Sequence, residues 1–186
     1  MQTQVLTFPS VAVIGAGLMG HGIAQIFALS GRQVWLNDLD SEMLEKAVEN
    51  IRTNLAVFVE NGLVAPDQVA PALARIHTTT SLEQAAGQAD YVVEAVSENL
   101  ALKQSLFKEL DAICRPESIL STNTSVISIT EIAAKANDRA RIVGTHFWNP
   151  PHLIPLVEVV PGDDTAPGTV ERTYKLLVEV GKHPVR

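Results

Sequence analysis

The chain has 186 residues, of which 46% are apolar and 19% are charged, and its formal net charge is −7. This is the composition of a globular protein with a sizeable core, and the acidic balance argues against nucleic acid or a membrane surface as a partner. The N-terminal segment MQTQVLTFPS has neither a basic start nor an apolar stretch, and no apolar run approaches the ~18 residues of a membrane span, so we expect a cytoplasmic protein.

The first elements predicted are a strand, a glycine-rich turn, a helix and a second strand. Residues 11–14 form a continuous apolar run, which is typical of a strand buried on both faces. Three glycines in the pattern GxGxxG follow at once, namely Gly15, Gly17 and Gly20. Apolar residues then recur at helical spacing until Gly31, and a second apolar strand over residues 34–36 leads to Asp38.

This order of elements is typical of a turn that binds a dinucleotide. Gly15 allows a tight turn, Gly17 lets the backbone approach a pyrophosphate, and Gly20 lets the helix pack closely on the strand. The N–H groups of the first helical residues, which include Leu18 and Met19, have no helical partner and can hold the pyrophosphate.

The acid at the end of the second strand predicts which dinucleotide is bound. Asp38 lies 18 residues beyond Gly20, where a carboxylate can accept hydrogen bonds from the adenosine ribose hydroxyls. Its charge would repel a 2′-phosphate, and residues 39–42 contain no arginine for that phosphate. The sequence therefore predicts NAD as the cofactor and not NADP.

The rest of the chain continues the alternation of helices and strands. The predicted helices cover residues 41–61, 66–74, a brief stretch after 81, 99–114, 129–136 and 165–180. The predicted strands cover residues 75–77, 91–96, 118–121, 142–144 and 153–160, followed by the start of another near residue 186. This pattern predicts one α/β domain over residues 1–186, with a doubly wound, mostly parallel sheet of the Rossmann type.

Two residues near the C-terminus form a candidate catalytic pair. Glu158 lies within a predicted strand that is otherwise apolar, where a carboxylate needs a partner, and His146 follows the preceding strand. If these strands are neighbours, the carboxylate can orient the imidazole, which could accept a proton from a substrate hydroxyl while hydride leaves for a nicotinamide. The spacing alone equally allows a purely structural His–Glu hydrogen bond.

Other polar and aromatic residues give weaker signals. We expect His21 near the surface of its helix, Glu94 as a cap of its strand, and Trp148 as a packed aromatic, although Trp148 could also wall a substrate pocket. The remaining histidines are isolated and lack the spacing of metal ligands, so no metal is expected.

Four stretches resemble, along essentially the whole chain, the NAD-binding domain of the 3-hydroxyacyl-CoA dehydrogenase family. They are VAVIGAGLMGHGIAQIFA, YVVEAVSENLALKQSLFKEL, STNTSVISITEIA and GTHFWNPPHLIPLVEVV. By this resemblance His146 and Glu158 match the catalytic histidine and its glutamate, and Ser125 matches the serine that hydrogen-bonds the reacting oxygen. Three residues match the nicotinamide end of the NAD site, namely Glu98, Lys103 and Asn123.

The resemblance implies an oxidoreductase of fatty acid metabolism that converts an L-3-hydroxyacyl-CoA to the 3-oxoacyl-CoA with NAD. His146 would be the general base and Glu158 would orient it. Family members continue into a helical domain that closes the cleft and makes a homodimer contact. Because this domain is absent from the 186 residues, we expect the chain to bind NAD but to turn over poorly.

The substrate is left open by two features of the sequence. Between Lys46 and Arg75 the only basic residue is Arg52, which is little to hold the phosphates of CoA. The stretch NPPHLIPLVEVVP also resembles the family branch that oxidises free hydroxy acids such as L-gulonate or carnitine. The alternatives are therefore the same chemistry on a free 3-hydroxy acid, and a dinucleotide-binding module without catalysis.

Overall fold

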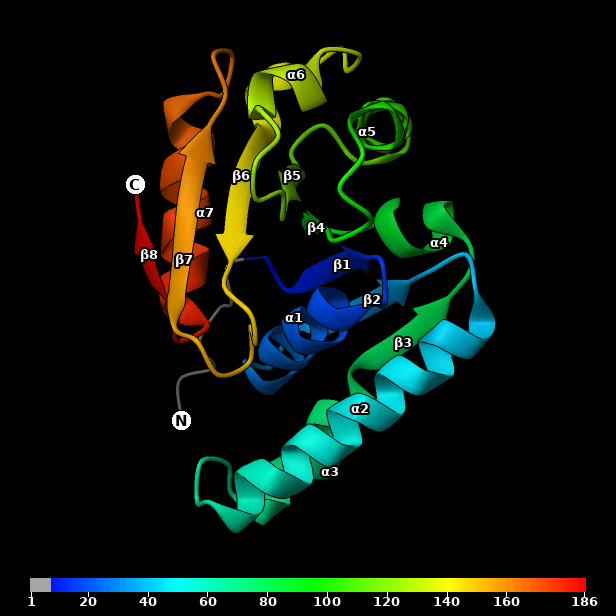
Figure 1. Ribbon diagram of the computed structural model, residues 1–186, viewed down its shortest axis with the longest axis vertical. Helices are drawn as coiled ribbons and strands as arrows, with labels where there is room; N and C mark the ends of the chain where they lie inside the picture. Colours follow the sequence, from blue (N-terminus) through cyan, green and yellow to red (C-terminus); the bar gives the residue numbers. More distant parts are fainter. Residues whose placement is uncertain (1–7) are drawn as a thin grey trace.

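The computed structural model describes residues 8–186, so the first seven residues of the N-terminal segment lie outside the described part. The described residues form an eight-stranded sheet with helices on both faces (Figure 1). The strands are β1 (Ser10–Ile14), β2 (Gln33–Asn37), β3 (Ile76–Thr79), β4 (Tyr91–Glu94), β5 (Ile119–Thr122), β6 (Ile142–Phe147), β7 (Leu156–Pro161) and β8 (His183–Val185). The helices are α1 (Leu18–Leu29), α2 (Ser41–Glu60), α3 (Pro66–Ala74), α4 (Leu82–Ala86), α5 (Leu100–Ile113), α6 (Ile129–Ala133) and α7 (Pro167–Glu179), with a short 3-10 helix at Arg139–Arg141.

The order of strands across the sheet is β3-β2-β1-β4-β5-β6-β7-β8. Neighbouring strands are parallel except β6 and β7, which are antiparallel. The order reverses on either side of β1, which is the arrangement of a doubly wound sheet. The predicted α/β fold with a mostly parallel sheet is confirmed.

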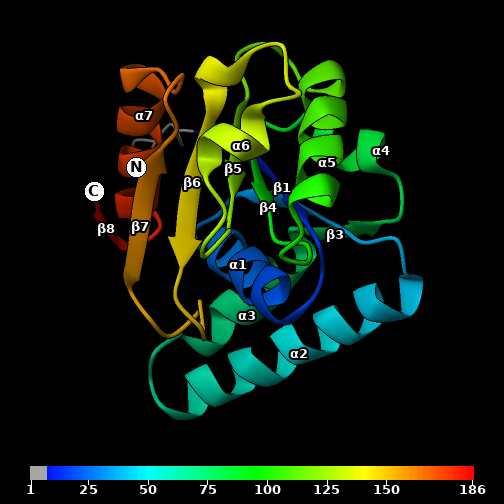
Figure 2. The same cartoon turned by 45° about the horizontal axis from the view of Figure 1, so that its top comes forward.

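The core lies in two layers, one on each face of the sheet. Val11 and Val13 of β1 point into the layer that also holds buried residues of α1, α2 and α7. Ala12 and Ile14 point into the opposite layer, with buried residues of α4, α5 and α6. The two groups of helices can be followed in Figure 2. Because both faces of β1 are covered, its sequence is apolar without alternation, as predicted.

Several predicted boundaries move by a few residues, and two of the shifts have a clear cause. Strand β6 continues past Gly144 to Phe147, because its last residues pair with the antiparallel β7. Strand β7 begins at Leu156 and not at residue 153, because the N–H groups of Leu153 and Ile154 both donate to the Pro150 carbonyl and close a turn. In the described part of the chain, no helix is both long and apolar enough to cross a membrane.

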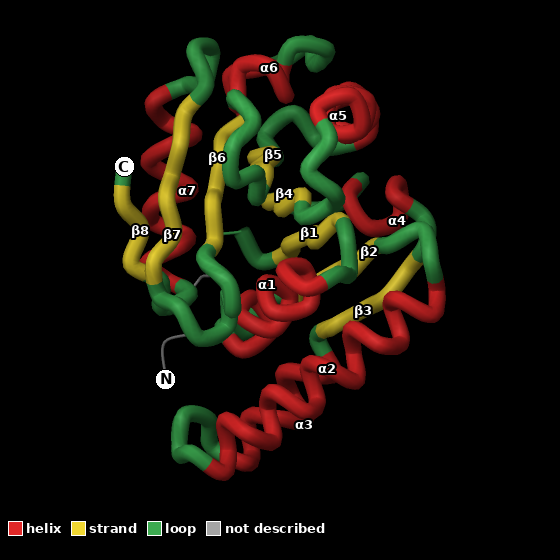
Figure 3. Tube along the Cα trace, viewed as in Figure 1, coloured by secondary structure: helices red, strands yellow, loops and turns green. Residues whose placement is uncertain are grey.

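The loops that follow the parallel strands gather at one edge of the sheet. Those after β4 and β5 lie beside each other (Figure 3) and are joined by a hydrogen bond from the Ser125 N–H to Glu98. Ligands of doubly wound sheets bind at this edge, so the fold brings together most of the predicted site residues.

Candidate active site

The glycine-rich turn joins the end of β1 to the start of α1. Gly15 has φ +100°, a left-handed conformation that glycine adopts without strain. A Cβ on Gly20 would lie 1.8 Å from the Gly15 carbonyl oxygen, whereas nothing lies within 4 Å of a Cβ built on Gly17. The helix therefore packs directly on the turn at Gly20, while the space over Gly17 is open to a ligand. Leu18 and Met19 begin α1, where N–H groups lack helical partners.

Asp38 lies beside this turn, at the carboxyl end of β2. Its Oδ2 accepts a hydrogen bond from the Ala16 N–H at 2.8 Å, and its Oδ1 accepts one from the Asp40 N–H at 3.2 Å. The bond to Ala16 was not predicted, because it joins segments that are far apart in sequence. A carboxylate has about four acceptor positions, so the predicted bonds to a ribose remain compatible with this arrangement.

A cavity of about 540 Å³ opens between the glycine-rich turn and Asp38. Its wall is largely apolar and includes Leu39, Met43, Leu82, Ala95, Val96, Leu102 and Leu106. An apolar slot with a carboxylate at its edge suits an adenosine, whose base is flat and whose ribose carries hydroxyls. These residues fit the dinucleotide that the sequence predicts.

Lys103 is buried in the interior, and its ammonium group lies between the carboxylates of two glutamates. Only 1% of its side chain is exposed, and its Nζ donates to both carboxylate oxygens of Glu94 at 2.7 and 2.9 Å, with Glu98 Oε2 at 3.3 Å. Glu94 is fully buried and also accepts from the Val96 N–H and the Thr122 hydroxyl. Glu94 thus caps its strand through the Val96 N–H, as expected, and in addition neutralises a buried ammonium, which the sequence did not predict; a buried charge requires such a partner.

Glu98 connects this buried pair to the loop that carries Ser125. Its Oε1 accepts hydrogen bonds from the Thr124 hydroxyl at 2.5 Å and from the N–H groups of Ser125 and Val126 at 3.0 and 3.2 Å. Burial raises the pKa of Glu98, but these hydrogen bonds and the charge of Lys103 outweigh it, so the pKa is lowered overall. Glu98 thus holds the 124–126 loop as an ionised acceptor.

Asn123 lies at the end of β5 and fixes the neighbouring strand. Its side-chain Oδ1 accepts a hydrogen bond from the Phe147 N–H at 2.8 Å. Phe147 is the residue after His146, so Asn123 holds the backbone beside the candidate base. This side chain is half-buried.

His146 and Glu158 face each other across the antiparallel strands β6 and β7. Nδ1 of His146 lies 2.6 Å from Oε2 of Glu158. The predicted pairing of the two strands is thus correct, although His146 lies within β6 and not after it. Glu158 is not buried as expected: 42% of its side chain is exposed, against 23% for His146.

The exposure of Glu158 follows from a cavity of about 420 Å³ that both residues line together with Ser125. The cavity also includes Thr124 and residues of α6 and its preceding loop. The structure therefore places the three predicted catalytic residues around one opening. Of the predicted cofactor residues, Gly15, Gly17 and Asp38 line the separate 540 Å³ cavity, and Lys103 lies in the buried cluster beneath the loops.

Two expectations about neighbouring residues are wrong. Trp148 is 46% exposed and its ring centroid lies 5.7 Å from that of His146, so it lies beside the candidate base and is not packed in the core. His21 is buried and not near the surface, because its Nδ1 lies 2.9 Å from the Gly17 carbonyl oxygen and the ring packs beneath the turn.

Comparisons with known proteins agree with this geometry. Residues 10–186 match the family model described as 3-hydroxyacyl-CoA dehydrogenase, NAD binding domain. The chain is 42% identical over 182 residues to the 3-hydroxyadipyl-CoA dehydrogenase of Escherichia coli K12, covering 98% of this chain and 38% of that relative. It is 41% identical over 175 residues to a probable 3-hydroxybutyryl-CoA dehydrogenase of Bacillus subtilis 168, covering 94% of this chain and 61% of the relative.

A crystal structure of 3-hydroxybutyryl-CoA dehydrogenase from Escherichia coli K12 matches with a TM-score of 0.93 and 42% identity, covering 97% of this chain and 38% of that one. The chain thus spans between about two fifths and three fifths of the length of these relatives. They are hydroxyacyl-CoA dehydrogenases, so the expected likeness to the gulonate and carnitine branch is not supported. That expectation rested on one short stretch, which the identity over the whole chain outweighs.

Proposed function

The chain belongs to the family of 3-hydroxyacyl-CoA dehydrogenase NAD-binding domains, and we propose that it is the cofactor-binding and base-carrying part of an enzyme that oxidises an L-3-hydroxyacyl-CoA to the 3-oxoacyl-CoA. The observation that carries this proposal is the contact of 2.6 Å between His146 and Glu158 at the rim of a cavity.

His146 acts as the general base. A carboxylate can only accept, so Nδ1 of the neutral ring carries the proton that is donated to Glu158, and Nε2 is left free to accept one. When Nε2 takes the proton of the substrate hydroxyl, the imidazole becomes positive, and the nearby carboxylate stabilises that charge. Glu158 therefore orients the ring.

Ser125 is placed to bind the reacting oxygen. It is exposed at the same cavity as His146, and its backbone is held by Glu98. A hydroxyl donor at this position would stabilise the carbonyl that forms as the substrate is oxidised.

The cofactor is NAD, which when bound supplies the hydride acceptor of the reaction. In our proposal Gly15, Gly17, Gly20, Leu18 and Met19 hold the pyrophosphate at the start of α1, and Asp38 holds the adenosine ribose. Glu98, Lys103 and Asn123 shape the nicotinamide end, where the buried Lys103 acts by fixing Glu98.

The substrate class is tested by following NADH absorbance with acetoacetyl-CoA and with free acetoacetate. The chain and a version extended by any downstream coding sequence are assayed side by side, because the helical domain of the family would exclude water from the cleft and supply the homodimer contact. NADH consumption that requires the thioester, mainly in the extended version, supports the proposal.

A free 3-hydroxy acid is the second candidate, because it lacks the phosphates of CoA. The surface of α2 is acidic and would bind those phosphates poorly. This helix carries Glu42, Glu45, Glu49 and Glu60 against two basic residues, Lys46 and Arg52. NADH consumption with free acetoacetate would favour this candidate. If NADH binds and neither substrate is reduced by either version, the two readings left are a different substrate and a dinucleotide-binding module without catalysis.

A further inference from the structure

The loop of residues 148–155 joins the strand of His146 to the strand of Glu158. It contains no helix or strand, although Leu153 and Ile154 close a turn onto the Pro150 carbonyl at 3.0 and 2.9 Å. A loop of this kind fixes the two strands only if other parts of the molecule hold it.

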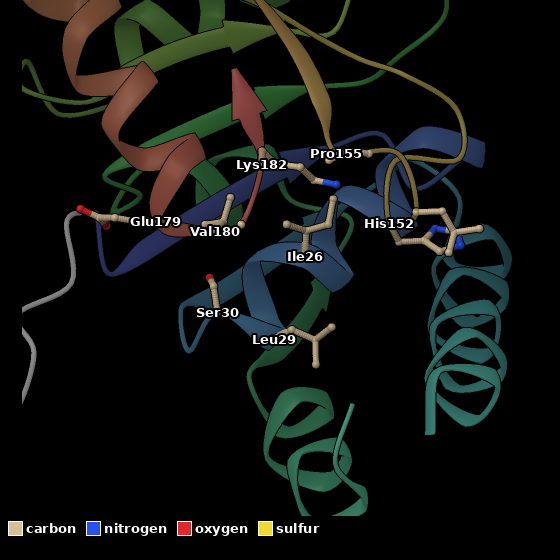
Figure 4. Close-up of a pocket in the computed structure, with 10 residues that line it drawn as sticks. Ile26, Leu29, Ser30, His152, Pro155, Glu179, Val180 and Lys182 are labelled. Atoms are coloured by element: carbon tan, nitrogen blue, oxygen red, sulfur yellow. The ribbon is translucent and has the colours of Figure 1, made fainter. Parts of the chain in front are cut away.

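Lys182 holds this loop from the turn between α7 and β8. The residue is 6% exposed, and its Nζ donates to the Pro151 carbonyl at 2.5 Å and to the Ile154 carbonyl at 2.8 Å. Figure 4 shows the side chain extending towards the loop along the edge of a cavity of about 330 Å³. Next to it, the His183 N–H donates to the Pro155 carbonyl at 2.8 Å.

The charge state of Lys182 is compatible with these two bonds at any pH near neutrality. Burial lowers the pKa of Lys182 to about 8. The ammonium has three N–H donors, and the neutral amine keeps two, which is the number of carbonyls it meets. Three ionisable groups share this part of the structure: His152 and Glu179 line the same cavity, and His21 faces His152.

The 148–155 loop packs directly against α1. A Cβ on Gly22 would lie 2.7 Å from Cγ of Pro151 and 2.9 Å from Nδ1 of His152, so loop and helix are in direct contact. The ring of His152 also lies 6.2 Å from that of His21, which in turn contacts the Gly17 carbonyl. The loop therefore rests on the helix that begins at the glycine-rich turn.

We propose that Lys182 is a positioning residue of the reaction, which seats the 148–155 loop on α1 and so fixes His146 and Glu158 relative to the glycine-rich turn. The inference rests on the proposed function, because only a transfer between substrate and cofactor requires this spacing. A small displacement of reacting groups lowers a rate by up to about 100-fold.

The first test observes His146 directly and needs no turnover. Long-range proton–nitrogen NMR of the imidazoles reports the tautomer and the hydrogen bond at His146 Nδ1. We expect K182M to shift or broaden the His146 signals, and K175M, an exposed lysine of α7, to leave them unchanged. H152A, which removes the imidazole from the contact between the loop and Gly22 and keeps Lys182 and Pro151, should act in the same direction and provides the answer if K182M does not fold.

The second test measures kinetics in whichever form of the chain turns over. K182M should lower kcat about 10-fold while the Kd for NADH changes less than about twofold, and K182R, which keeps the donors, should restore part of kcat. If K182M is less stable but keeps wild-type His146 signals and kcat, Lys182 is only structural and the inference is overturned. If nothing turns over, the proposed function fails, and Lys182 then has no role in a reaction; the His146 signals separately show whether Lys182 fixes the position of that ring.

Discussion

The N–H of Ala16 donates to Oδ2 of Asp38 at 2.8 Å, so the acid at the end of β2 is fastened to the glycine-rich turn. Asp38 thereby shapes the turn and also lines the 540 Å³ cavity beside it. An acid read from the sequence as a ligand of the ribose thus has a second partner within the protein, and both roles depend on one carboxylate.

Replacing Asp38 with alanine is therefore expected to weaken NADH binding by at least about 10-fold. The change removes the acceptor for Ala16 together with the proposed contact to the ribose. NADH fluorescence titration gives the Kd. D67A, at an exposed acid of α3, serves as the control and should bind as the wild type does. A wild-type Kd for D38A would contradict the assignment.

Two glycines of the turn should respond differently to alanine. At Gly17 a Cβ meets no protein atom and the backbone is extended, so G17A should keep its thermal stability and lose at least about 10-fold in NADH affinity, because the methyl group enters the ligand's space. At Gly20 the Cβ would collide with the Gly15 carbonyl, so G20A should be markedly destabilised. Calorimetry measures the loss of stability, and the NADH titration measures the loss of affinity. Equal losses of Tm in G17A and G20A would refute the different roles given to the two glycines.

Replacing His146 with glutamine should leave NADH binding intact and lower kcat by at least about 100-fold in either direction, because the side chain can neither accept the hydroxyl proton in the oxidation nor donate a proton to the oxygen in the reduction. The matched control is H77Q, at an exposed histidine of β3, which should retain full activity. The rate is followed with acetoacetyl-CoA in the form of the chain that turns over. Unchanged kcat in H146Q would rule out the proposed mechanism.

The parts of the site that could be predicted from the sequence are those with local signals. The three glycines, Asp38 and the apolar strands follow from periodicity and spacing, and the pairing of His146 with Glu158 follows from an acid in an apolar strand opposite a histidine. Their exposure could not be predicted, because the cavity beside them is formed by the distant 124–130 segment.

The contacts that the sequence does not reveal depend on how the helices and strands pack together in the fold. The Glu94–Lys103 pair forms because Lys103 of α5 reaches the end of β4. The hydrogen bond from Lys182 to Pro151 depends on the position of β8 beside β7 in the sheet. An acid at the end of a buried strand, followed by a lysine on the apolar face of the next helix, is the signal that could have identified the first of these.

The Glu94–Lys103 pair should be essential for stability. K103M leaves the fully buried Glu94 carboxylate without its cation, which costs about 3–5 kcal/mol in the free energy of unfolding. Urea denaturation measures this loss. K108M, at an exposed position of the same helix α5, should change stability by less than about 0.5 kcal/mol. A K103M variant as stable as K108M would show that Glu94 has another partner or is neutral.

Stability should also depend on pH through Lys182. Burial lowers its pKa from 10.5 to about 8 in the folded chain, so between these pH values the unfolded state binds more protons and the free energy of unfolding rises with pH. Below about pH 8 both states are protonated and the residue contributes no slope. The difference in unfolding free energy between the wild type and K182M should therefore increase by up to about 1.4 kcal/mol per pH unit between pH ~8 and ~10.

The difference in unfolding free energy between the wild type and K182M isolates Lys182, because the other titrating groups contribute to the pH dependence of both proteins. Tyr91, for example, whose pKa burial raises to about 12, contributes equally to both proteins. Urea denaturation of the two proteins at several pH values provides the curves. Parallel curves from pH ~7 to ~10 would mean that the Lys182 ammonium is fully compensated by the Pro151 and Ile154 carbonyls and keeps its ordinary pKa.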